Sequence, residues 1–549
     1  MAGPNASGGE QRFTYVVVGA GSAGCVLANR LSENPANTVC LIEAGPADRS
    51  PLIHVPLGVM RLINHPRLNW NYATTPQAHA GGRSIAIPRG KTLGGSSSIN
   101  GMVYTRGHPS DYDDWARLGN PGWSFREVLP YFRRSENNRD FRDSVYHGTD
   151  GPLQVGFLDQ YNPLSEIFFQ AGEALQYRRN ADFCGETHEG FGRRQASIAE
   201  GRRSSASTAY LAPARKRPNL HILTGALARR VVIEDGRATG VEIEIGGAVR
   251  TIRADGEVIL SAGAMGSPHL LLLSGVGDAE ELRESGIAPR HHLPGVGRNL
   301  QDHIAAAVQY TSPTTAPYGL SWKSLPWLAW NVVSYPFTGR GLLANNILHS
   351  GAFVRSLPGL DRPDVQLILV PAIRDRKGRM GRGFGFGVLS VLLRPKSTGR
   401  VFLHSPDPKA APGIDPDFFA ETDDIETIVR GLRIARRLVD TAPFAPYRGA
   451  EIDPGREVES AEGMAAYVRE KSHTAYHPVG TCAMGPGKDA VVDATLKVHG
   501  ISGLRVADAS IMPTLLGGNT NGPAIMVGEK AADLILGRPA LPADDLPQI

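Results

Sequence analysis

The sequence predicts a mixed α/β protein, α+β overall, in which a parallel sheet forms one domain and an antiparallel sheet flanked by helices forms the other. A β-branched run at residues 15–18 is followed by a glycine-rich turn, a helical segment and a second apolar run at 39–42, which is typical of a βαβ unit. Strand-like segments separated by polar turns recur at 221–260 and at 365–403. The 549 residues exceed what one compact core usually contains, so we expect two domains, or one large domain with an inserted cap.

Composition excludes several classes of protein. Apolar residues make up 41% and charged residues 20% of the chain, as in globular rather than disordered proteins. The net charge of +4 is small for this length, so we expect no nucleic-acid partner. The four cysteines form no CxxC pair, which predicts neither a metal site nor a disulfide framework. The absence of a signal-peptide pattern and of an 18-residue apolar run favours a cytoplasmic protein without a transmembrane segment, and we expect a monomer or homodimer.

The glycine-rich turn has the spacing of a dinucleotide-binding loop in a Rossmann-like domain. Gly19 permits the tight turn, Gly21 lets the backbone approach a pyrophosphate, and Gly24 lets the helix pack against the strand. Ser22 and Ala23 open the helix, whose free N–H groups and positive dipole end favour phosphates.

An acidic residue ends the second strand about 20 residues after this loop. Glu43, followed by Ala44, is in the position from which a carboxylate binds ribose hydroxyls. A carboxylate argues against NADP, because it would repel the 2′-phosphate. It does not distinguish NAD from FAD.

The rest of the chain supplies the elements of both domains. Residues 44–104 form a long irregular stretch, a length that often indicates function. The predicted elements that follow are strands at 221–223, 230–234, 241–245 and 258–260, a helix at 263–273, antiparallel strands at 365–370, 387–393 and 400–403, helices at 425–438 and 461–471, a strand at 504–506 and a final helix at 524–536.

A second loop, residues 89–101, concentrates glycine and hydroxyl side chains. Its Gly90-Lys91-Thr92 could belong to a Walker loop, but that loop needs a glycine five residues before Gly90, where Ile85 stands. The sequence therefore excludes this type of ATP site.

This loop and three later segments resemble the glucose–methanol–choline (GMC) oxidoreductase family, with its choline-dehydrogenase-like and hydroxymethylfurfural-oxidase-like branches nearest. The first signature reads Gly90-Lys91-x-Leu93-Gly94-Gly95-Ser96-Ser97-x-Ile99-Asn100-x-x-x-Tyr104-x-x-Gly107. The second reads Gly263-Ala264-x-x-Ser267-Pro268-x-Leu270-Leu271-x-x-Ser274-Gly275-Val276-Gly277. The C-terminal segments are His477-Pro478-Val479-Gly480-Thr481-Cys482 and Asn519-Thr520-Asn521-Gly522-Pro523.

The resemblance implies FAD rather than NAD, and a flavin domain assembled from residues 13–155, 200–310 and 475–540 with a substrate domain at 156–199 and 311–474. It implies a backbone contact from Ala228 to the adenine side and places Asp508 and Ala509 near the pyrophosphate and ribityl chain. The other residues that it implies for the flavin site are Leu93, Gly94, Gly95, Asn100, Gly101, Met102, Val103, Asn519, Thr520 and Pro523. Some relatives bind FAD covalently through a histidine at the position of Ile99, so we expect non-covalent FAD here.

Alcohol oxidation needs a base for the hydroxyl proton, and histidine suits that role. His477, whose backbone is fixed by a following proline and a nearby glycine, matches the active-site base of the family. Asn519 matches the position where relatives carry His or Asn, and its NH₂ group can hydrogen-bond a developing alkoxide. Asn521 has the same chemistry, and we prefer Asn519. Alternatively, both asparagines cap the helix that starts near Ala524.

The sequence thus predicts an FAD-dependent alcohol dehydrogenase or oxidase that passes hydride from a CH–OH donor to flavin N5, with oxygen or another electron acceptor. The alternatives are a photodecarboxylase, which is expected to lack the histidine found at His477, or a hydroxynitrile lyase on the same scaffold. No motif identifies the alcohol, because we expect substrate contacts within residues 310–470. There, Trp327, Trp330 and Tyr335 lie among apolar residues, and core packing is favoured over a lid or membrane-facing patch.

Overall fold

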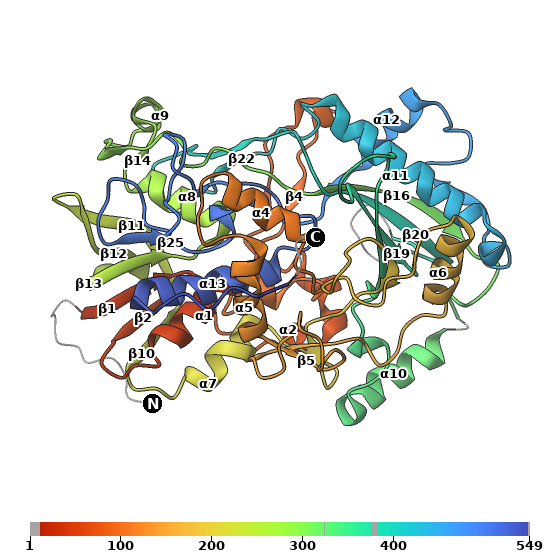
Figure 1. The fold of residues 1–549 in the computed structure, drawn as a ribbon, viewed down its shortest axis with the longest axis horizontal. Helices are drawn as coiled ribbons and strands as arrows, with labels where there is room; N and C mark the ends of the chain where they lie inside the picture. The colour runs from red at the N-terminus through yellow and green to blue at the C-terminus, as the bar shows by residue number, and fades with distance from the viewer. Residues whose placement is uncertain (1–10, 323, 375–380, 547–549) are drawn as a thin grey trace.

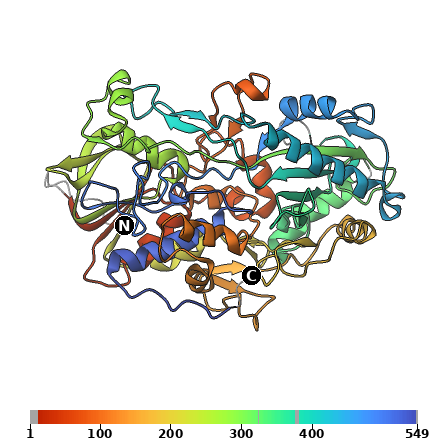
Figure 2. The same ribbon diagram turned by 45° about the horizontal axis from the view of Figure 1, so that its top comes forward.

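The computed structural model describes residues 11–322, 324–374 and 381–546 and contains two large sheets toward opposite ends of the molecule (Figures 1 and 2). The first sheet has seven strands in the order β10-β2-β1-β13-β12-β11, with β25 also paired to β13. Pairing is parallel from β10 to β13 and at β25, whereas β11, β12 and β13 form an antiparallel meander. The strands are β1 (Gln11–Val18), β2 (Val39–Glu43), β10 (Leu220–Thr224), β11 (Ala226–Glu234), β12 (Arg237–Ile245), β13 (Ala248–Leu260) and β25 (Leu504–Val506).

Two helices distant in sequence pack together beside the parallel strands. The helix α1 (Ser22–Leu31) follows the glycine loop and contacts α13 (Asn521–Leu536), which begins three residues before the predicted start at Ala524. Close approach requires a glycine, because a Cβ on Gly528 of α13 would lie 2.9 Å from the Ala23 carbonyl oxygen. The C-terminal segment is thereby brought to the glycine loop.

The second sheet has eight strands and is antiparallel, as predicted. Its order is β23-β16-β20-β19-β18-β7, with β17 and β24 as side branches. One face packs against α11 (Thr422–Asp440), and the other lines a cavity described below. The strands are β7 (Gly190–Arg193), β16 (Ile304–Thr311), β17 (Gly319–Leu320), β18 (Ser350–Val354), β19 (Val365–Val370), β20 (Gly383–Leu392), β23 (Glu451–Asp453) and β24 (His473–Thr474).

Two predictions about this region were wrong. The flavin-domain boundary predicted at residue 310 falls within β16, so it assigns most of this strand to the flavin domain, whereas β16 pairs within the second sheet and its alternate residues fit the core under α11. The strand predicted at 400–403 is β21 (Arg400–Phe402), which pairs only with β22 (Gly413–Asp415), in a separate two-stranded sheet.

The helix α10 (Leu325–Thr338) also departs from expectation. The prediction that Trp327 and Trp330 pack in the core was wrong. Trp330 is 67% exposed and Trp327 is 45% exposed. Only Asn331 of this helix is buried, and the ring of Tyr335 is anchored by a hydrogen bond from its hydroxyl to the Gly201 carbonyl (2.9 Å). Trp327 stacks on the ring of Tyr318, but most of the other apolar side chains of α10 face outward and stay exposed.

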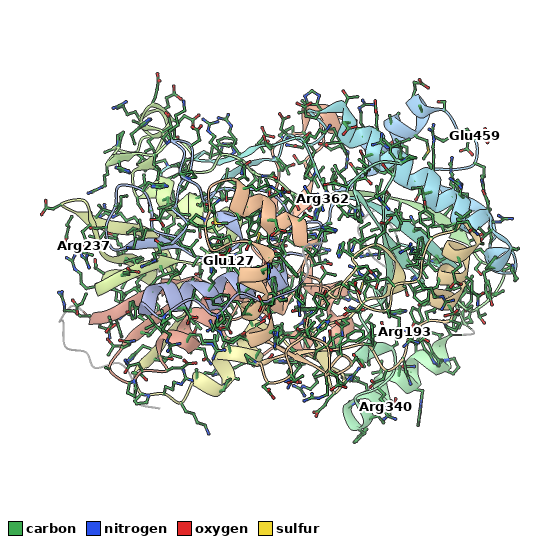
Figure 3. The ribbon with its side chains drawn as sticks, viewed as in Figure 1. Glu127, Arg193, Arg237, Arg340, Arg362 and Glu459 are labelled. Atoms are coloured by element: carbon green, nitrogen blue, oxygen red, sulfur yellow. The ribbon has the colours of Figure 1, made fainter. Side chains whose placement is uncertain are left out.

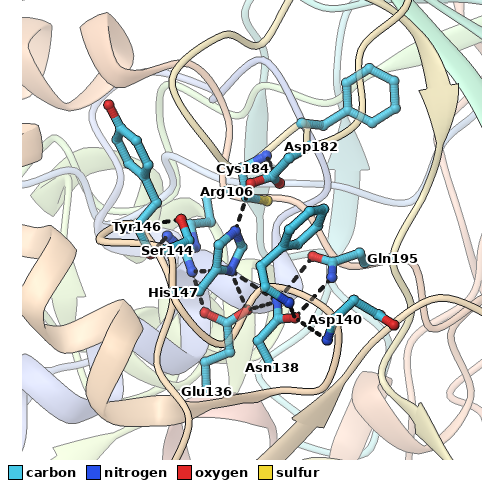
Figure 4. A network of polar contacts seen from close by, with 12 residues as sticks. Arg106, Glu136, Asn138, Asp140, Ser144, Tyr146, His147, Asp182, Cys184 and Gln195 are labelled. Atoms are coloured by element: carbon cyan, nitrogen blue, oxygen red, sulfur yellow. Dashed lines mark hydrogen bonds and ion pairs between the residues drawn. The ribbon is translucent and has the colours of Figure 1, made fainter.

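A buried ionic network ties β5 (Glu136–Asn138) to the neighbouring loops (Figure 4). Arg106 pairs with Glu136, which also contacts Nδ1 of His147 at 2.9 Å. The other ring nitrogen, Nε2, lies 2.8 Å from a carboxylate oxygen of Asp182. His147 is thus held between two carboxylates, and these hydrogen bonds outweigh burial and raise its pKa.

Candidate active site

A cavity of about 1360 Å³ lies between the glycine loop, the glycine–serine loop and the uncovered face of the second sheet. It exceeds the roughly 300–1,000 Å³ of an ordinary small-molecule pocket, so it has room for a dinucleotide and a substrate. The sheet contributes alternate side chains, among them Gln366, Ile368 and Val370 of β19.

The glycine loop has the geometry of a phosphate cradle. Gly19 has φ +98°, and a Cβ there would lie 2.5 Å from the Ser261 carbonyl oxygen. A Cβ on Gly24 would lie 1.9 Å from the Gly19 oxygen, so this glycine serves packing. Gly21 differs, because its Cβ would meet only the Ser261 oxygen at 3.6 Å, and the residue lines the cavity. At Gly21 no side chain lies between the backbone and the part of the cavity where a pyrophosphate would fit, at the N-terminus of α1.

Glu43 lines the same part of the cavity, and its carboxylate is bound to the backbone. One oxygen accepts the Ala20 N–H (3.0 Å) and the other accepts the Gly45 N–H (2.8 Å). Burial raises its pKa to about 7, against the effect of these two hydrogen bonds. Each oxygen has a second lone pair, so ribose binding by Glu43 stays a prediction.

Most of the residues expected to bind the cofactor line this cavity. Four do not. Leu93 packs in the core, Gly94 donates its N–H to the Ala20 carbonyl (2.7 Å), Gly24 packs against Gly19, and Pro523 is buried in α13. In this structure these four residues shape the loops, and their cofactor contacts stay predictions. The expected residues that do line the cavity are Gly19, Gly21, Ser22, Ala23, Glu43, Ala44, Gly95, Asn100, Gly101, Met102, Val103, Ala228, Asp508, Ala509, Asn519 and Thr520, together with His477.

The backbone of His477 is held from two directions. Its N–H donates to Oδ1 of Asp302 at 2.7 Å. Nη2 of Arg89, in the glycine–serine loop, donates to the carbonyl of Tyr476 at 2.7 Å. Tyr476 has φ +71°, an uncommon conformation for a tyrosine, which these contacts maintain.

Hydrogen bonds determine which nitrogen of His477 is free. Nε2 of His303 lies 3.1 Å from the Leu393 carbonyl, which only accepts, so Nε2 carries the proton. Burial lowers the pKa of His303 to about 4, so its ring is neutral and its Nδ1 is an acceptor. This Nδ1 lies 2.9 Å from Nδ1 of His477, which must donate. In neutral His477, Nε2 is then left with a lone pair.

That lone pair meets Asn519. Nδ2 of Asn519 lies 2.9 Å from Nε2 of His477. Oδ1 of Asn519 accepts from Nη2 of Arg194 at 3.0 Å, which orients the amide so that its NH₂ group faces the histidine. Asn521 instead accepts a hydrogen bond from Ser22 (2.8 Å), and neither asparagine side chain caps α13. The His477 and Asn519 side chains therefore converge, 42 residues apart in sequence.

Burial holds the pKa of His477 well below 6.5, and the charges of Arg89 and Arg194 act in the same direction. The ring is therefore neutral near pH 7, as a proton acceptor must be.

Sequence reasoning missed His303 and Arg194. No local signal separates His303 from the other histidines, because its partner is 174 residues away. Arg194 lies in an arginine pair whose other member, Arg193, is exposed, and only the fold shows that Arg194 is buried.

Comparisons with known proteins decide the family. The GMC oxidoreductase family models match residues 13–305 and 395–528. The chain belongs to the GMC oxidoreductase family. This GMC oxidoreductase is 45% identical to an alcohol dehydrogenase [acceptor] from Pseudomonas putida, covering 95% of this chain and 96% of that protein. It is 46% identical to an oxygen-dependent choline dehydrogenase from Rhizobium etli, covering 96% of each.

The solved structure of pyridoxine 4-oxidase from Mesorbium loti has a TM-score of 0.86 and 32% identity, covering 95% of this GMC oxidoreductase and 98% of that chain. The predicted fold class and family are confirmed, as is an FAD-dependent oxidoreductase acting on an alcohol. The relatives give no support to a photodecarboxylase or a lyase. None of the helices in the described residues has the length and apolarity to span a membrane.

Proposed function

We propose that this GMC oxidoreductase oxidises its alcohol between His477 and Asn519, and that the product is an aldehyde or ketone. The observation that carries this proposal is the 2.9 Å contact between Nδ2 of Asn519 and the unprotonated Nε2 of His477 at the cavity wall. A substrate hydroxyl that took the place of this direct contact would donate to Nε2 and accept from Nδ2.

The two side chains have different roles in the reaction. Nε2 of His477 takes the hydroxyl proton, while the Nδ1 proton stays directed at His303. The NH₂ group of Asn519 donates to the oxygen as negative charge develops on it. Bound FAD would supply the acceptor for the hydride that leaves the carbinol carbon.

We further propose that FAD is bound without a covalent link. Ile99 lines the cavity and packs in a small apolar cluster with Ile53, Leu62 and Leu68. His108, the histidine after it, caps α4 (Pro109–Arg117) by accepting the Ser110 N–H. Acid precipitation should therefore release all of the yellow colour, and colour kept in the washed pellet would contradict this binding mode.

Anaerobic mixing of the purified yellow protein with a panel of alcohols tests the function. We expect at least one alcohol to bleach the flavin absorbance, and carbonyl product to form in equal amount. Subsequent addition of oxygen or of a dye distinguishes the two kinds of electron acceptor. Turnover that required a nicotinamide would refute the proposal.

A further inference from the structure

Arg194 is a buried cation beside the proposed catalytic pair. Its side chain is 2% exposed and lines the cavity, and Nη2 donates to Asn519. Nε and Nη1 have no hydrogen-bond partner within the described residues, and no carboxylate of those residues forms an ion pair with Arg194. A guanidinium is costly to bury in this way, so its charge acts on whatever occupies the cavity.

Another cation acts on His477 in the same direction. Arg89 joins Arg194 in disfavouring the protonated ring, and Asp302, whose carboxylate accepts the His477 N–H, interacts electrostatically with Arg89 rather than with Arg194. The carboxylates that line the cavity form no ion pair with Arg194 or His477 among the described residues. Glu43 binds backbone N–H groups, Asp508 accepts from Ser267 (2.5 Å), Asp453 accepts from Gln309 (3.0 Å), and Glu470 pairs with Lys471 (2.8 Å).

We infer that the site selects uncharged or anionic alcohols and rejects quaternary-ammonium alcohols, with Arg194 as the residue that sets this selection. The inference rests on the proposed function, because it assumes that the hydroxyl lies between His477 and Asn519. An ammonium two carbons from that hydroxyl would lie within roughly 12 Å of the guanidinium in any orientation. With an effective dielectric constant near 20, repulsion at that distance disfavours the cation by about tenfold, and by more when closer.

A matched pair of substrates tests this selection. Choline and 3,3-dimethyl-1-butanol have nearly the same shape and differ in charge. We expect kcat/KM for the uncharged alcohol to exceed that for choline by at least about tenfold. Dissociation constants from the perturbed flavin spectrum should show the same order, so slow turnover does not hide the result. Equal values, or a preference for choline, would overturn the inference.

Variants assign the effect to one residue. Arg194→Met should reduce the preference for the uncharged alcohol, Arg194→Lys should keep most of it, and the matched control Arg193→Met on the exposed neighbour should leave it unchanged. A preference that survives Arg194→Met intact would overturn the assignment. A separate measurement tests the proposed function itself. That function would be refuted if, with an alcohol of the panel, the flavin of His477→Ala were bleached as fast as the flavin of the unchanged protein.

The outward face of α10 supports a second, independent inference. Pro326, Trp330, Val333 and Phe337 follow the helical spacing and are all exposed, Trp330 by 67% and Phe337 by 87%. Trp322, just before the helix, is 89% exposed. So many large apolar side chains on one exposed helix indicate an interaction surface.

The charges around this helix are basic. The sequence has no Asp or Glu from residue 303 to 360, whereas it has Lys323 and Arg340 there, together with Arg355, which is paired with Glu189 at 3.0 Å. Arg340 follows the helix and is exposed (Figure 3). Exposed Arg202 acts on Tyr335 of the helix, although the exposed acid Glu200 lies near the same end.

We propose that α10 binds the surface of an anionic lipid bilayer, lying in the plane of the interface. Aromatic and aliphatic side chains would enter the headgroup region while the arginines contact lipid phosphates. A 14-residue helix is about 21 Å long, too short to cross a bilayer. The segment after it reaches Asn346, Ile347 and Leu348 of the cavity wall, so a bound membrane would lie near the active site.

Vesicle flotation of the full-length protein tests this surface. We expect binding to phosphatidylglycerol–phosphatidylcholine vesicles and a loss of at least about tenfold for Trp330→Ser/Phe337→Ser. Arg202→Gln/Arg340→Gln should weaken binding to the anionic vesicles only. The matched control Leu118→Ser/Val145→Ser, on exposed apolar residues elsewhere, should bind as the unchanged protein does. Absence of binding, unaltered binding by the α10 variant, or a dimer that this variant dissociates would overturn the proposal.

Discussion

Nδ1 of His303 lies 2.9 Å from Nδ1 of His477, and this contact makes the opposite nitrogen, Nε2, the one with the lone pair that can accept a proton. The pairing of β16 with β24 creates it. Ile304 pairs with Thr474, so the residues that precede one and follow the other come together. The first predictions follow from this relationship.

Replacing the proposed base should slow the reaction without releasing the cofactor. His477→Ala should reduce the rate of flavin bleaching by about two to four orders of magnitude, the usual contribution of a positioned base. Stopped-flow absorbance measures the rate, and the flavin-to-protein ratio serves as the control. A fully loaded variant with a near-normal rate would assign the base elsewhere.

The two asparagines should differ. Asn519 contacts His477, whereas Asn521 contacts Ser22. Asn519→Ala should therefore lower kcat more than the matched variant Asn521→Ala, while losing less than His477→Ala. A larger loss in Asn521→Ala would reverse our choice between them.

His303 should act on the tautomer of its neighbour. His303→Leu removes the acceptor for the Nδ1 proton of His477 and should lower kcat/KM by about one to two orders of magnitude. His303→Asn keeps an acceptor atom near the same place and should recover part of the loss. The low pKa of His477 places the acid limb of the kcat/KM profile below pH 6.5 in the unchanged enzyme. A kcat/KM pH profile of His303→Leu and of His303→Asn that is identical to that of the unchanged enzyme would rule out this role for His303.

Two glycines of the first loop should fail in different ways. Gly21 has φ −79° and room for a Cβ, so the Gly21→Val protein should fold. It should retain less FAD, because the valine side chain would enter the pyrophosphate space. Gly24→Val instead forces a Cβ to 1.9 Å from the Gly19 oxygen and should lower the melting temperature strongly. Flavin absorbance and thermal unfolding separate the two outcomes. Full FAD loading of a folded Gly21→Val would contradict the cradle.

The network around His147 should make stability depend on pH. Its pKa is raised in the folded state, so its contribution is fully present below the unfolded value near 6.5 and is lost as pH rises through the folded value. The melting-temperature difference between the unchanged protein and His147→Gln should therefore be larger at pH 6 than at pH 9. Parallel pH profiles of the two proteins would show that the charge of His147 contributes nothing.

The sequence by itself determined the features whose chemistry is local. The glycine spacing at 19–24, the strand before it and the helix after it lie within one short segment, so backbone sterics alone predict a cradle there. The resemblance added His477 and Asn519, which the fold brings together.

Only the tertiary structure decided the electrostatics of the site and the face of α10. The partners of His477 and Asn519 come from residues 174 and 325 positions away, and no local pattern records such contacts. An apolar helix has the same periodicity whether its side chains meet a core or solvent, so Trp327 and Trp330 were assigned wrongly to the core. Which of the two occurs depends on whether the rest of the chain supplies a complementary apolar surface, and among the described residues most of the helix stays exposed.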